Sequence, residues 1–465
     1  MRILLCCADW GVPLGGCAGS SVHVRAMARA LSGLGHEVRL VVTNADGPSL
    51  PPQPVTIVAN RLWWPTVRDG VEGFRAQGDK APHRAPATES GGHNLTRDAA
   101  QATAAYPGAQ GASSLKTRLY YDHLPRWIDR FEELVWHRRR FESAVGKALV
   151  ELQPHGVYER HALGQTGTSR ALTRLGHAAP PHLLEVNASL ADERTRRGHL
   201  PGFLGRLAQA QEAWQWRRAD RVFCVSGALA ETLARNGVAA ERIEVAPNGV
   251  DITRFTPDRP KGFLRSRLGC DPQAVLVGYV GSLAPGRGAE EFLDIIAKTL
   301  PLAPHVHGVV AGDGPLSGEL RRQARTLGLD GRLDFLGAVP HDLVPEVLVD
   351  LDIALACYPA QQGFYFSSMK LLEYMACGLA TVCSRAGQMG ELIEDGVCGI
   401  LVEPGAAQIW AETVAALSRD AALRTSLGVQ ARRRALAGPT WEKNAGRVVE
   451  VIEALAARRN GVGRP

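Results

Sequence analysis

The segment FYFSSMKLLEYMACG, residues 364–378, places polar side chains inside an apolar helical pattern. Apolar residues recur at helical spacing from residue 369 onward, and Lys370 and Glu373 interrupt them. Ser367 and Ser368 stand where the N-cap of a helix is expected. Such a helix start can bind phosphate groups, and a carboxylate one turn later can accept hydrogen bonds from two sugar hydroxyls. The plainer interpretation is a capped core helix with a charged edge.

Glycine-rich segments could line the same site. They are GVPLGGCAGSSVHV (11–24), GSLAPGRG (281–288) and AGDGP (311–315). Gly16 and Gly19 let a ligand approach the backbone just before a helix start, and Gly314 does the same in the third segment. Arg287 lies among glycines close to Ser282, and arginine with free N–H groups suits a diphosphate. Each segment could instead be a tight turn, and none has the G-x-G-x-x-G spacing of a dinucleotide site.

Short apolar runs alternate with helical patterns, which is typical of doubly wound parallel sheets. The runs form two series, at 2–8, 37–43, 156–161, 182–187, 221–226 and 243–249, and at 275–283, 306–314, 333–337, 353–359, 380–384 and 399–402. The linker TPDRPKG, 256–262, separates them. We therefore expect an α/β chain of two tandem Rossmann-like domains, 1–255 and 263–440, facing a central cleft. A final helix within 441–465 is expected to cross back to the first domain, ahead of a basic tail.

The composition is that of a globular protein with more than one domain, since 45% of its 465 residues are hydrophobic and 22% charged. A net charge of +6 suits phosphorylated ligands or an anionic membrane surface but is too small to indicate nucleic acid.

Residues 66–116, rich in small and polar types, predict a mobile insertion. The motif DLD, 350–352, precedes a strand pattern and so lies at the wrong end for a metal in the cleft.

The location expected is cytoplasmic. Nine cysteines without a C-x-x-C pair favour free thiols over disulfides or zinc. The N-terminal apolar run is too short for a signal peptide, and no run is long enough to span a membrane. Peripheral contact with the inner face of the membrane, through basic aromatic segments such as WQWRRAD (214–220), is an open alternative.

Seven segments in the correct order resemble one family, the family 4 retaining glycosyltransferases of the GT-B type. They are GSSVHVRAMARALSGLGHEV, ADRVFCVS, VAPNGVD, GYVGSLAPGRG, AGDGP, FLGAVP and KLLEYMACGLATV. The resemblance implies a nucleotide-sugar donor held mainly by the second domain, an acceptor held mainly by the first, and no metal or other cofactor. It assigns Glu373 to the donor ribose and Arg287 to the diphosphate. Lys370, with Ser368 and Met369 beside it, falls on the helix start that receives the phosphates.

The chain departs from the family pattern at three positions. Tyr365 stands where many members have a glutamate that touches the donor sugar, which leaves the sugar open. Ser282 stands where many have an arginine, so that Arg287 and Lys370 would neutralise the leaving group. Many members have a histidine at the end of the strand that here ends in Asn187.

The resemblance implies transfer of one sugar from a nucleoside diphosphate sugar, a UDP- or GDP-sugar first, to an acceptor hydroxyl with retention at the anomeric carbon. Polysaccharide, glycolipid or natural-product glycoside synthesis is compatible with this reaction. His161, one strand before Asn187, is a candidate acceptor-side residue, with a packed loop histidine as the alternative. Tyr365 and Asn187 also suggest a catalytically silent nucleotide-sugar-binding partner subunit, and an inverting transferase or an epimerase on the same fold stays open.

Overall fold

The structure is a computed structural model that describes residues 1–46, 50–58, 137–360 and 367–461, apart from Trp10, Cys17, Arg197, His199, Pro201 and Cys270. The chain divides into two compact units, Met1–Val58 with Arg138–Pro465, and Ala59–His137. All elements described below belong to the first unit. The predicted insertion at 66–116 and the predicted donor-sugar position Tyr365 lie outside the described residues.

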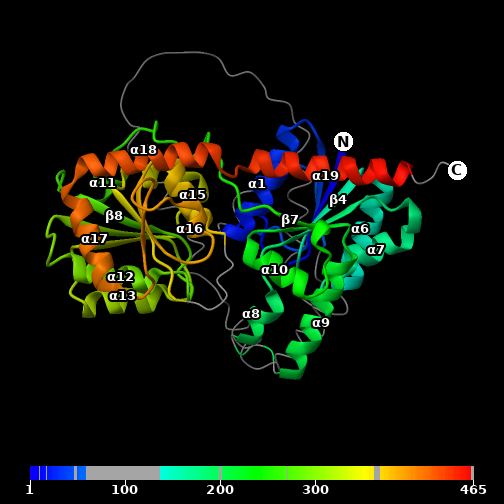
Figure 1. Cartoon of the computed structure of the whole chain (residues 1–465), viewed down its shortest axis with the longest axis horizontal. Coiled ribbons are helices and arrows are strands. Elements are labelled where there is room, and N and C mark those ends of the chain that lie inside the picture. The colour runs from blue at the N-terminus through cyan, green and yellow to red at the C-terminus, as the bar shows by residue number, and fades with distance from the viewer. Residues whose placement is uncertain are drawn as a thin grey trace, which may run out of the picture. The chain divides into compact units, whose positions relative to one another are not determined.

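The first domain is built on a parallel sheet of seven strands in the order β3-β2-β1-β4-β5-β6-β7 (Figure 1). Its strands are β1 (Arg2–Cys7), β2 (Glu37–Val42), β3 (Val55–Ile57), β4 (Gly156–Arg160), β5 (His182–Val186), β6 (Arg221–Cys224) and β7 (Ile243–Val245). Its helices are α1 (Gly19–Gly33), α6 (Arg138–Leu152), α7 (Gly167–Leu175), α8 (Leu190–Arg196), α9 (Gly202–Arg218) and α10 (Gly227–Arg235), with 3-10 turns η3 (Gly176–Ala178) and η4 (Ala240–Arg242).

Strand β1 is buried on both faces because helices cover each side of the sheet. Successive side chains of a strand point to opposite faces. Ile3 and Leu5 therefore join a core with α1, whereas Leu4 and Cys6 join a second core with α6 and α7. The continuous apolar run of β1 is the pattern that such two-sided burial requires.

The second domain is built on a parallel sheet of six strands in the order β10-β9-β8-β11-β12-β13. Its strands are β8 (Val275–Val280), β9 (Val306–Ala311), β10 (Leu333–Gly337), β11 (Ile353–Ala356), β12 (Ala380–Ser384) and β13 (Ile400–Val402). Its helices are α11 (Phe263–Leu268), α12 (Ala289–Thr299), α13 (Ser317–Thr326), α14 (Val344–Asp350), α15 (Met369–Ala376), α16 (Met389–Leu392), α17 (Ala407–Arg419) and α18 (Ala421–Ala437), with the 3-10 turn η5 (His341–Leu343).

The predicted fold class is confirmed, because each predicted apolar run contains a strand and both sheets are parallel. Strand β3 was not predicted; its three residues directly follow a proline-rich stretch, PPQP, at 51–54. None of the described helices is long and apolar enough to cross a membrane. Seven cysteines within the described range are free and buried.

The last helix, α19 (Trp441–Gly461), crosses back to the first domain as predicted (Figure 1). Trp441, Val448 and Ile452 are buried in the core that contains β1 and α1. Gly156 of β4 lies directly beneath this helix, and a Cβ placed there would come within 2.6 Å of the Ile452 side chain. The glycine therefore allows α19 to lie close to the sheet.

Candidate active site

The predicted helix start forms the N-terminus of α15, at the carboxyl end of the second sheet. Ser368 is buried, and its Oγ accepts a hydrogen bond from the Leu371 backbone N–H at 3.3 Å. The same Oγ lies 3.0 Å from the hydroxyl of Tyr358. An N-cap of this kind fixes the direction of the helix and leaves the other N–H groups of the first turn available to an anion.

Lys370 lies in the first turn of α15 and points toward the loop that contains Arg287. Its Nζ donates a hydrogen bond to the Arg287 backbone carbonyl at 3.1 Å. The ammonium also lies 3.9 Å from the ring centroid of Tyr279 and 4.9 Å from that of Tyr358. Burial lowers the pKa of Lys370 to about 7, and the charge of Arg287 acts in the same direction. A bound anion would favour the charged form again.

The loop at 281–288 is held in shape by Tyr279. Its hydroxyl oxygen lies 3.0 Å from the carbonyl oxygen of Ser282 and 2.9 Å from that of Arg287, so its single proton can be donated to either of them. Ser282 itself is exposed, and Arg287 is half-buried. Lys370 thus contacts the backbone of Arg287, and the two positive charges are close enough to affect each other.

The glycine at position 314 allows close approach of the chain to itself. A Cβ at Gly314 would collide with the Leu283 carbonyl, and one at Gly312 would collide with that of Gly281. Gly312 also has φ +151°, which favours glycine. The loops that follow β8 and β9 are therefore in backbone contact, and the donor contact predicted for Gly314 stays a prediction.

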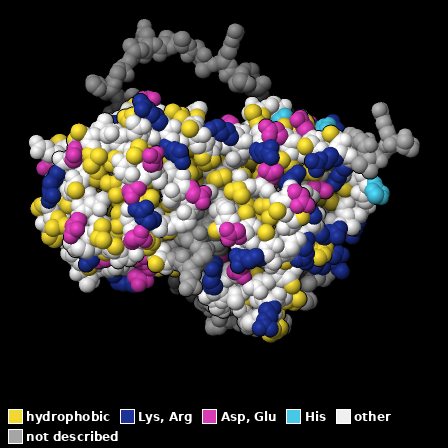
Figure 2. All heavy atoms as spheres, in the orientation of Figure 1, with side chains coloured by type: hydrophobic (Ala, Val, Ile, Leu, Met, Phe, Trp, Pro, Cys, Tyr) yellow, Lys and Arg dark blue, Asp and Glu magenta, His cyan; other side chains and the backbone are white. Residues whose placement is uncertain are grey.

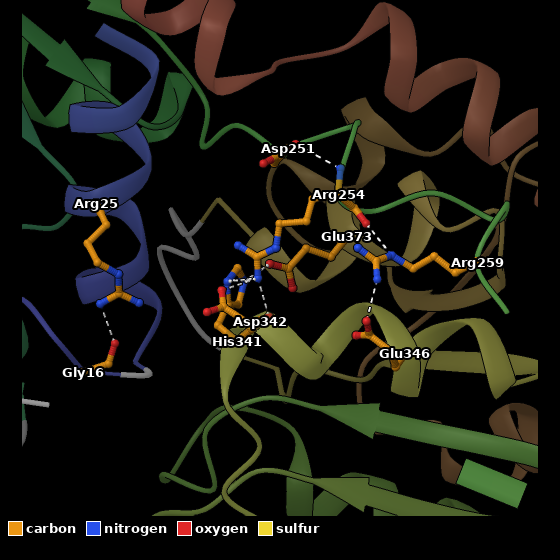
Figure 3. A network of polar contacts seen from close by, with 9 residues as sticks. All are labelled: Gly16, Arg25, Asp251, Arg254, Arg259, His341, Asp342, Glu346 and Glu373. Atoms are coloured by element: carbon orange, nitrogen blue, oxygen red, sulfur yellow. Dashed lines mark hydrogen bonds and ion pairs between the residues drawn. The ribbon is translucent and has the colours of Figure 1, made fainter. Parts of the chain in front are cut away.

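Glu373 lines a cleft of about 230 Å³ together with residues of α1, the segment 251–255 and Trp441. Its Oε1 lies 2.8 Å from Nε2 of His341 (Figure 3). Arg254 holds His341 in place by donating to its backbone carbonyl at 2.6 Å and pairs with Asp342 at 2.9 Å. His341 was not predicted; its place in PHDL, just after the strand pattern LDFLG, was the only signal. A ribose at Glu373 would share this carboxylate with His341.

The first domain contributes the loop before α1. Arg25 donates to the carbonyls of Gly16, at 2.7 Å, and Leu14 (Figure 3). A Cβ on Gly16 would come within 3.1 Å of atoms of Pro13 and Ser21, so this glycine too serves a tight turn. Gly19, at the start of α1, lies against the sulfur of Met369. The two predicted segments around residues 16–19 and 368–373 are therefore adjacent.

A continuous chain of polar contacts joins the first sheet to the start of α15. Nε2 of His23 lies 2.5 Å from Glu185 at the end of β5, and Nδ1 lies 2.9 Å from Oδ1 of Asn248. The backbone N–H and side-chain amide of Asn248 donate to Ser367 at 3.0 and 2.9 Å. Burial raises the pKa of Glu185, but the contact with His23 outweighs it and holds that pKa below its usual value. The carboxylate is thus charged near neutral pH.

The acceptor-side candidates lie at the carboxyl end of the first sheet. His161 is buried, and its Nε2 lies 2.9 Å from Glu212 of α9. Glu212 also accepts from the Leu190 backbone N–H at 2.8 Å, which caps α8. The structure therefore gives His161 a packing role, as in the alternative interpretation, and its contact with an acceptor stays a prediction. Asn187 directly follows β5 and is half-buried.

The two carboxylates of the DLD motif bind backbone and side-chain groups of the protein itself. Asp350 accepts from the backbone N–H groups of Gly262 and Leu264 at 2.6 and 2.5 Å, at the start of α11. Asp352 pairs with Arg265 at 2.7 Å. Both carboxylates thus tie the beginning of the second domain to its sheet.

Comparison with known proteins identifies the family and the fold of this chain. Two parallel α/β sheets with a glycine loop and a capped helix at the carboxyl ends define a GT-B glycosyltransferase fold. Residues 274–420 match the family model described as "Glycosyl transferases group 1", and residues 94–254 match "Glycosyltransferase Family 4". The chain belongs to this family of glycosyltransferases, as its resemblance predicted.

Relatives with assigned names are similar over part of their length. A 2-deoxystreptamine N-acetyl-D-glucosaminyltransferase of Streptomyces fradiae is 29% identical over 319 residues, covering 66% of this chain and 72% of that protein. A D-inositol 3-phosphate glycosyltransferase of Geodermatophilus obscurus is 32% identical, covering 51% and 53%. One component of the phosphatidylinositol N-acetylglucosaminyltransferase of Arabidopsis thaliana is 31% identical, covering 40% and 39%. This chain thus spans about half or less of the last two.

Solved structures confirm the fold. Anabaena HepE in complex with UDP has a TM-score of 0.62 at 19% identity, covering 98% of this chain and 100% of that one. Sucrose-phosphate synthase from Thermosynechococcus elongatus has a TM-score of 0.67 at 16% identity, with the same coverage. At these identities the likeness concerns the GT-B fold alone.

Proposed function

We propose that the protein is a retaining glycosyltransferase that moves one sugar from a nucleoside diphosphate sugar to an acceptor hydroxyl. The observation that carries the proposal is the cluster at the start of α15. Lys370 and Arg287 lie beside a capped helix N-terminus, and Glu373 follows one turn later in a cleft. Cations and helix dipole suit a diphosphate, and the carboxylate suits ribose hydroxyls.

The donor we propose first is a UDP-sugar, because HepE has been solved in complex with UDP and with UDP-glucose. The names of three relatives contain inositol phosphate, phosphatidylinositol and 2-deoxystreptamine, which all have a polyhydroxylated six-membered carbon ring. We therefore propose a hydroxyl of such a ring as the acceptor. The buried free thiols support the cytoplasmic location.

The chemistry follows from where charge develops. As the bond between the anomeric carbon and the diphosphate breaks, negative charge grows on the leaving oxygen. Lys370, Arg287 and the α15 N-terminus would stabilise that charge, so the proposal invokes no metal or cofactor. Gly16 and Gly19 would bring the first domain against the transferred sugar, with the acceptor held near Asn187. An inverting enzyme on the same fold would give the opposite anomer, which product NMR distinguishes.

Nucleotides should stabilise the protein through Glu373. We expect one of UDP, GDP, ADP or dTDP to raise the melting temperature, because a ligand at a hundred times its dissociation constant adds about 2.7 kcal/mol. Glu373→Ala should abolish most of this effect. Glu346→Ala is the matched control, since Glu346 pairs with Arg259 and does not line the cleft. Failure of all four nucleotides would contradict the donor site. Binding without transfer or hydrolysis would instead favour the silent partner subunit.

Donor binding should take up a proton above neutral pH. In the protein without donor, the Lys370 side chain has a pKa of about 7, so it is mostly neutral at about pH 8. A bound diphosphate stabilises the ammonium and raises that pKa, so binding must draw a proton from solution and nucleotide affinity must fall as pH rises above about 7. Titration calorimetry at about pH 8, in two buffers of different ionisation enthalpy, measures the uptake. Lys370→Met should show none, and equal heats for the wild type would contradict this assignment.

A further inference from the structure

The contacts of helix α9 identify the face of the helix that is turned inward. A Cβ on Gly205 would lie 2.8 Å from Oγ1 of Thr195, so α8 packs directly on this glycine. The side-chain amide of Gln209 donates to Asp192 of α8 at 2.6 Å. Glu212, on the same side of the helix, is buried against His161. These contacts fix the rotation of α9 about its axis.

The opposite face of α9 is a stripe of apolar side chains open to solvent. Phe203, Leu207, Ala210 and Trp214 follow one another at spacings of three and four residues, which places them on one side of a helix. Phe203 is 73% exposed and Leu207 66%. Trp214 is 39% exposed, and Ala210 is exposed as well. An apolar stripe that continues along the whole helix requires a partner surface.

Basic side chains border this stripe on both sides. By helical geometry, Arg206 and Arg217 lie along one edge and Arg218 along the other. The guanidinium of Arg218 lies 5.2 Å from the ring centroid of Trp214. The helix contains a single acidic residue, Glu212, and its carboxylate is buried. In Figure 2, basic and hydrophobic side chains are visible at the lower end of the molecule, where Figure 1 labels α8 and α9. The outer face of α9 is therefore both apolar and positively charged.

We propose that the outer face of α9 docks on the surface of an anionic lipid bilayer. A helix that presents Phe, Leu and Trp on one side, with arginines beside them, matches the pattern of helices that lie in the membrane interface. The arginines complement lipid phosphates, each contributing about fivefold in affinity near an anionic surface. A protein partner would fit less well, because a stable interface needs about 20–30 residues a side and this stripe is one helix wide.

Vesicle flotation of the full chain tests the proposal. The wild type should float with vesicles containing roughly 30% anionic phospholipid and should bind purely zwitterionic vesicles at least about fivefold more weakly. The double variant F203S/L207S should lower the partition coefficient at least about tenfold. Its matched control is V150S/I409S, which changes two exposed apolar residues on other helices, 71% and 55% exposed, and should bind like the wild type. Melting curves verify that all variants are folded.

The charge requirement is tested separately. Arg206→Glu should weaken binding to anionic vesicles about tenfold, whereas Arg325→Glu, on the exposed side of α13, should change it less than twofold if only α9 contacts lipid. The proposal is overturned if the wild type does not float with any vesicle, or if F203S/L207S and its control bind equally. It is also overturned if the stripe variants change the sedimentation mass instead of flotation, because the partner is then a second copy of the chain.

Discussion

Replacement of Lys370 by methionine is expected to lower turnover about a hundredfold or more at saturating donor. Methionine keeps the unbranched side chain that passes Tyr279 and Tyr358 but removes the ammonium at 3.1 Å from the Arg287 carbonyl. The loss should appear mainly in kcat, because the charge on the leaving diphosphate is largest in the transition state. Turnover is measured by the rate at which the nucleoside diphosphate is released.

The control for this variant is Lys298→Met on α12, whose ammonium forms an exposed helical pair with Asp294. It should keep wild-type activity, since such exposed pairs contribute little. The melting temperature of Lys370→Met should not fall, because burial already disfavours the charged lysine in the free protein. Undiminished turnover in Lys370→Met would remove this residue from the catalytic assignment.

Replacement of Glu212 by alanine is expected to destabilise the first domain by about 3–5 kcal/mol. Glu212 is 1% exposed and accepts hydrogen bonds from the Leu190 backbone N–H at 2.8 Å and the Ser189 hydroxyl at 3.2 Å, beside its 2.9 Å contact with His161. Alanine would leave the Leu190 N–H and the His161 ring nitrogen without this acceptor, whereas the Ser189 hydroxyl keeps Asp192 at 2.8 Å. Thermal and urea unfolding followed by tryptophan fluorescence would measure the loss, since Trp216 packs against His161.

Two further variants serve as controls for the stability loss expected of Glu212→Ala. Glu151→Ala changes a 65% exposed carboxylate that pairs with Arg39, and should alter stability by less than about 0.5 kcal/mol. Glu212→Gln keeps the size and one acceptor oxygen and should lose less than Glu212→Ala. If Glu212→Ala and Glu151→Ala unfold alike, the carboxylate does not anchor α8 and α9.

Local patterns predicted most of the fold, because parallel strands buried on two faces appear as apolar runs. The cap at Ser368 and the helix of Lys370 and Glu373 were predictable for the same reason, since N-cap signals are local. The contact between Glu373 and His341 was not predictable. It joins side chains 32 residues apart from different elements, and no periodicity encodes such a pair.

Glycine illustrates why site prediction is less secure than fold prediction. Gly314 and Gly16 were predicted from the close approach that a missing side chain permits, and the close approach is present in both. The neighbouring groups are the chain's own, the Leu283 carbonyl in one case and Pro13 in the other. A glycine in the sequence indicates that another group packs close to the backbone. Only the three-dimensional structure identifies whether that group is a ligand or another part of the chain.

The return of α19 into the first domain has a consequence for how the chain is made. Trp441, Val448 and Ile452 complete a core whose other members begin at Ile3. Domains generally fold as units during synthesis, from the N-terminus onward. Here the first domain lacks one wall of its core until the second domain and residue 452 have been translated. The first domain is therefore synthesised first but completes its core last. A chain that ends in the linker would expose the apolar face that α19 covers in the full chain.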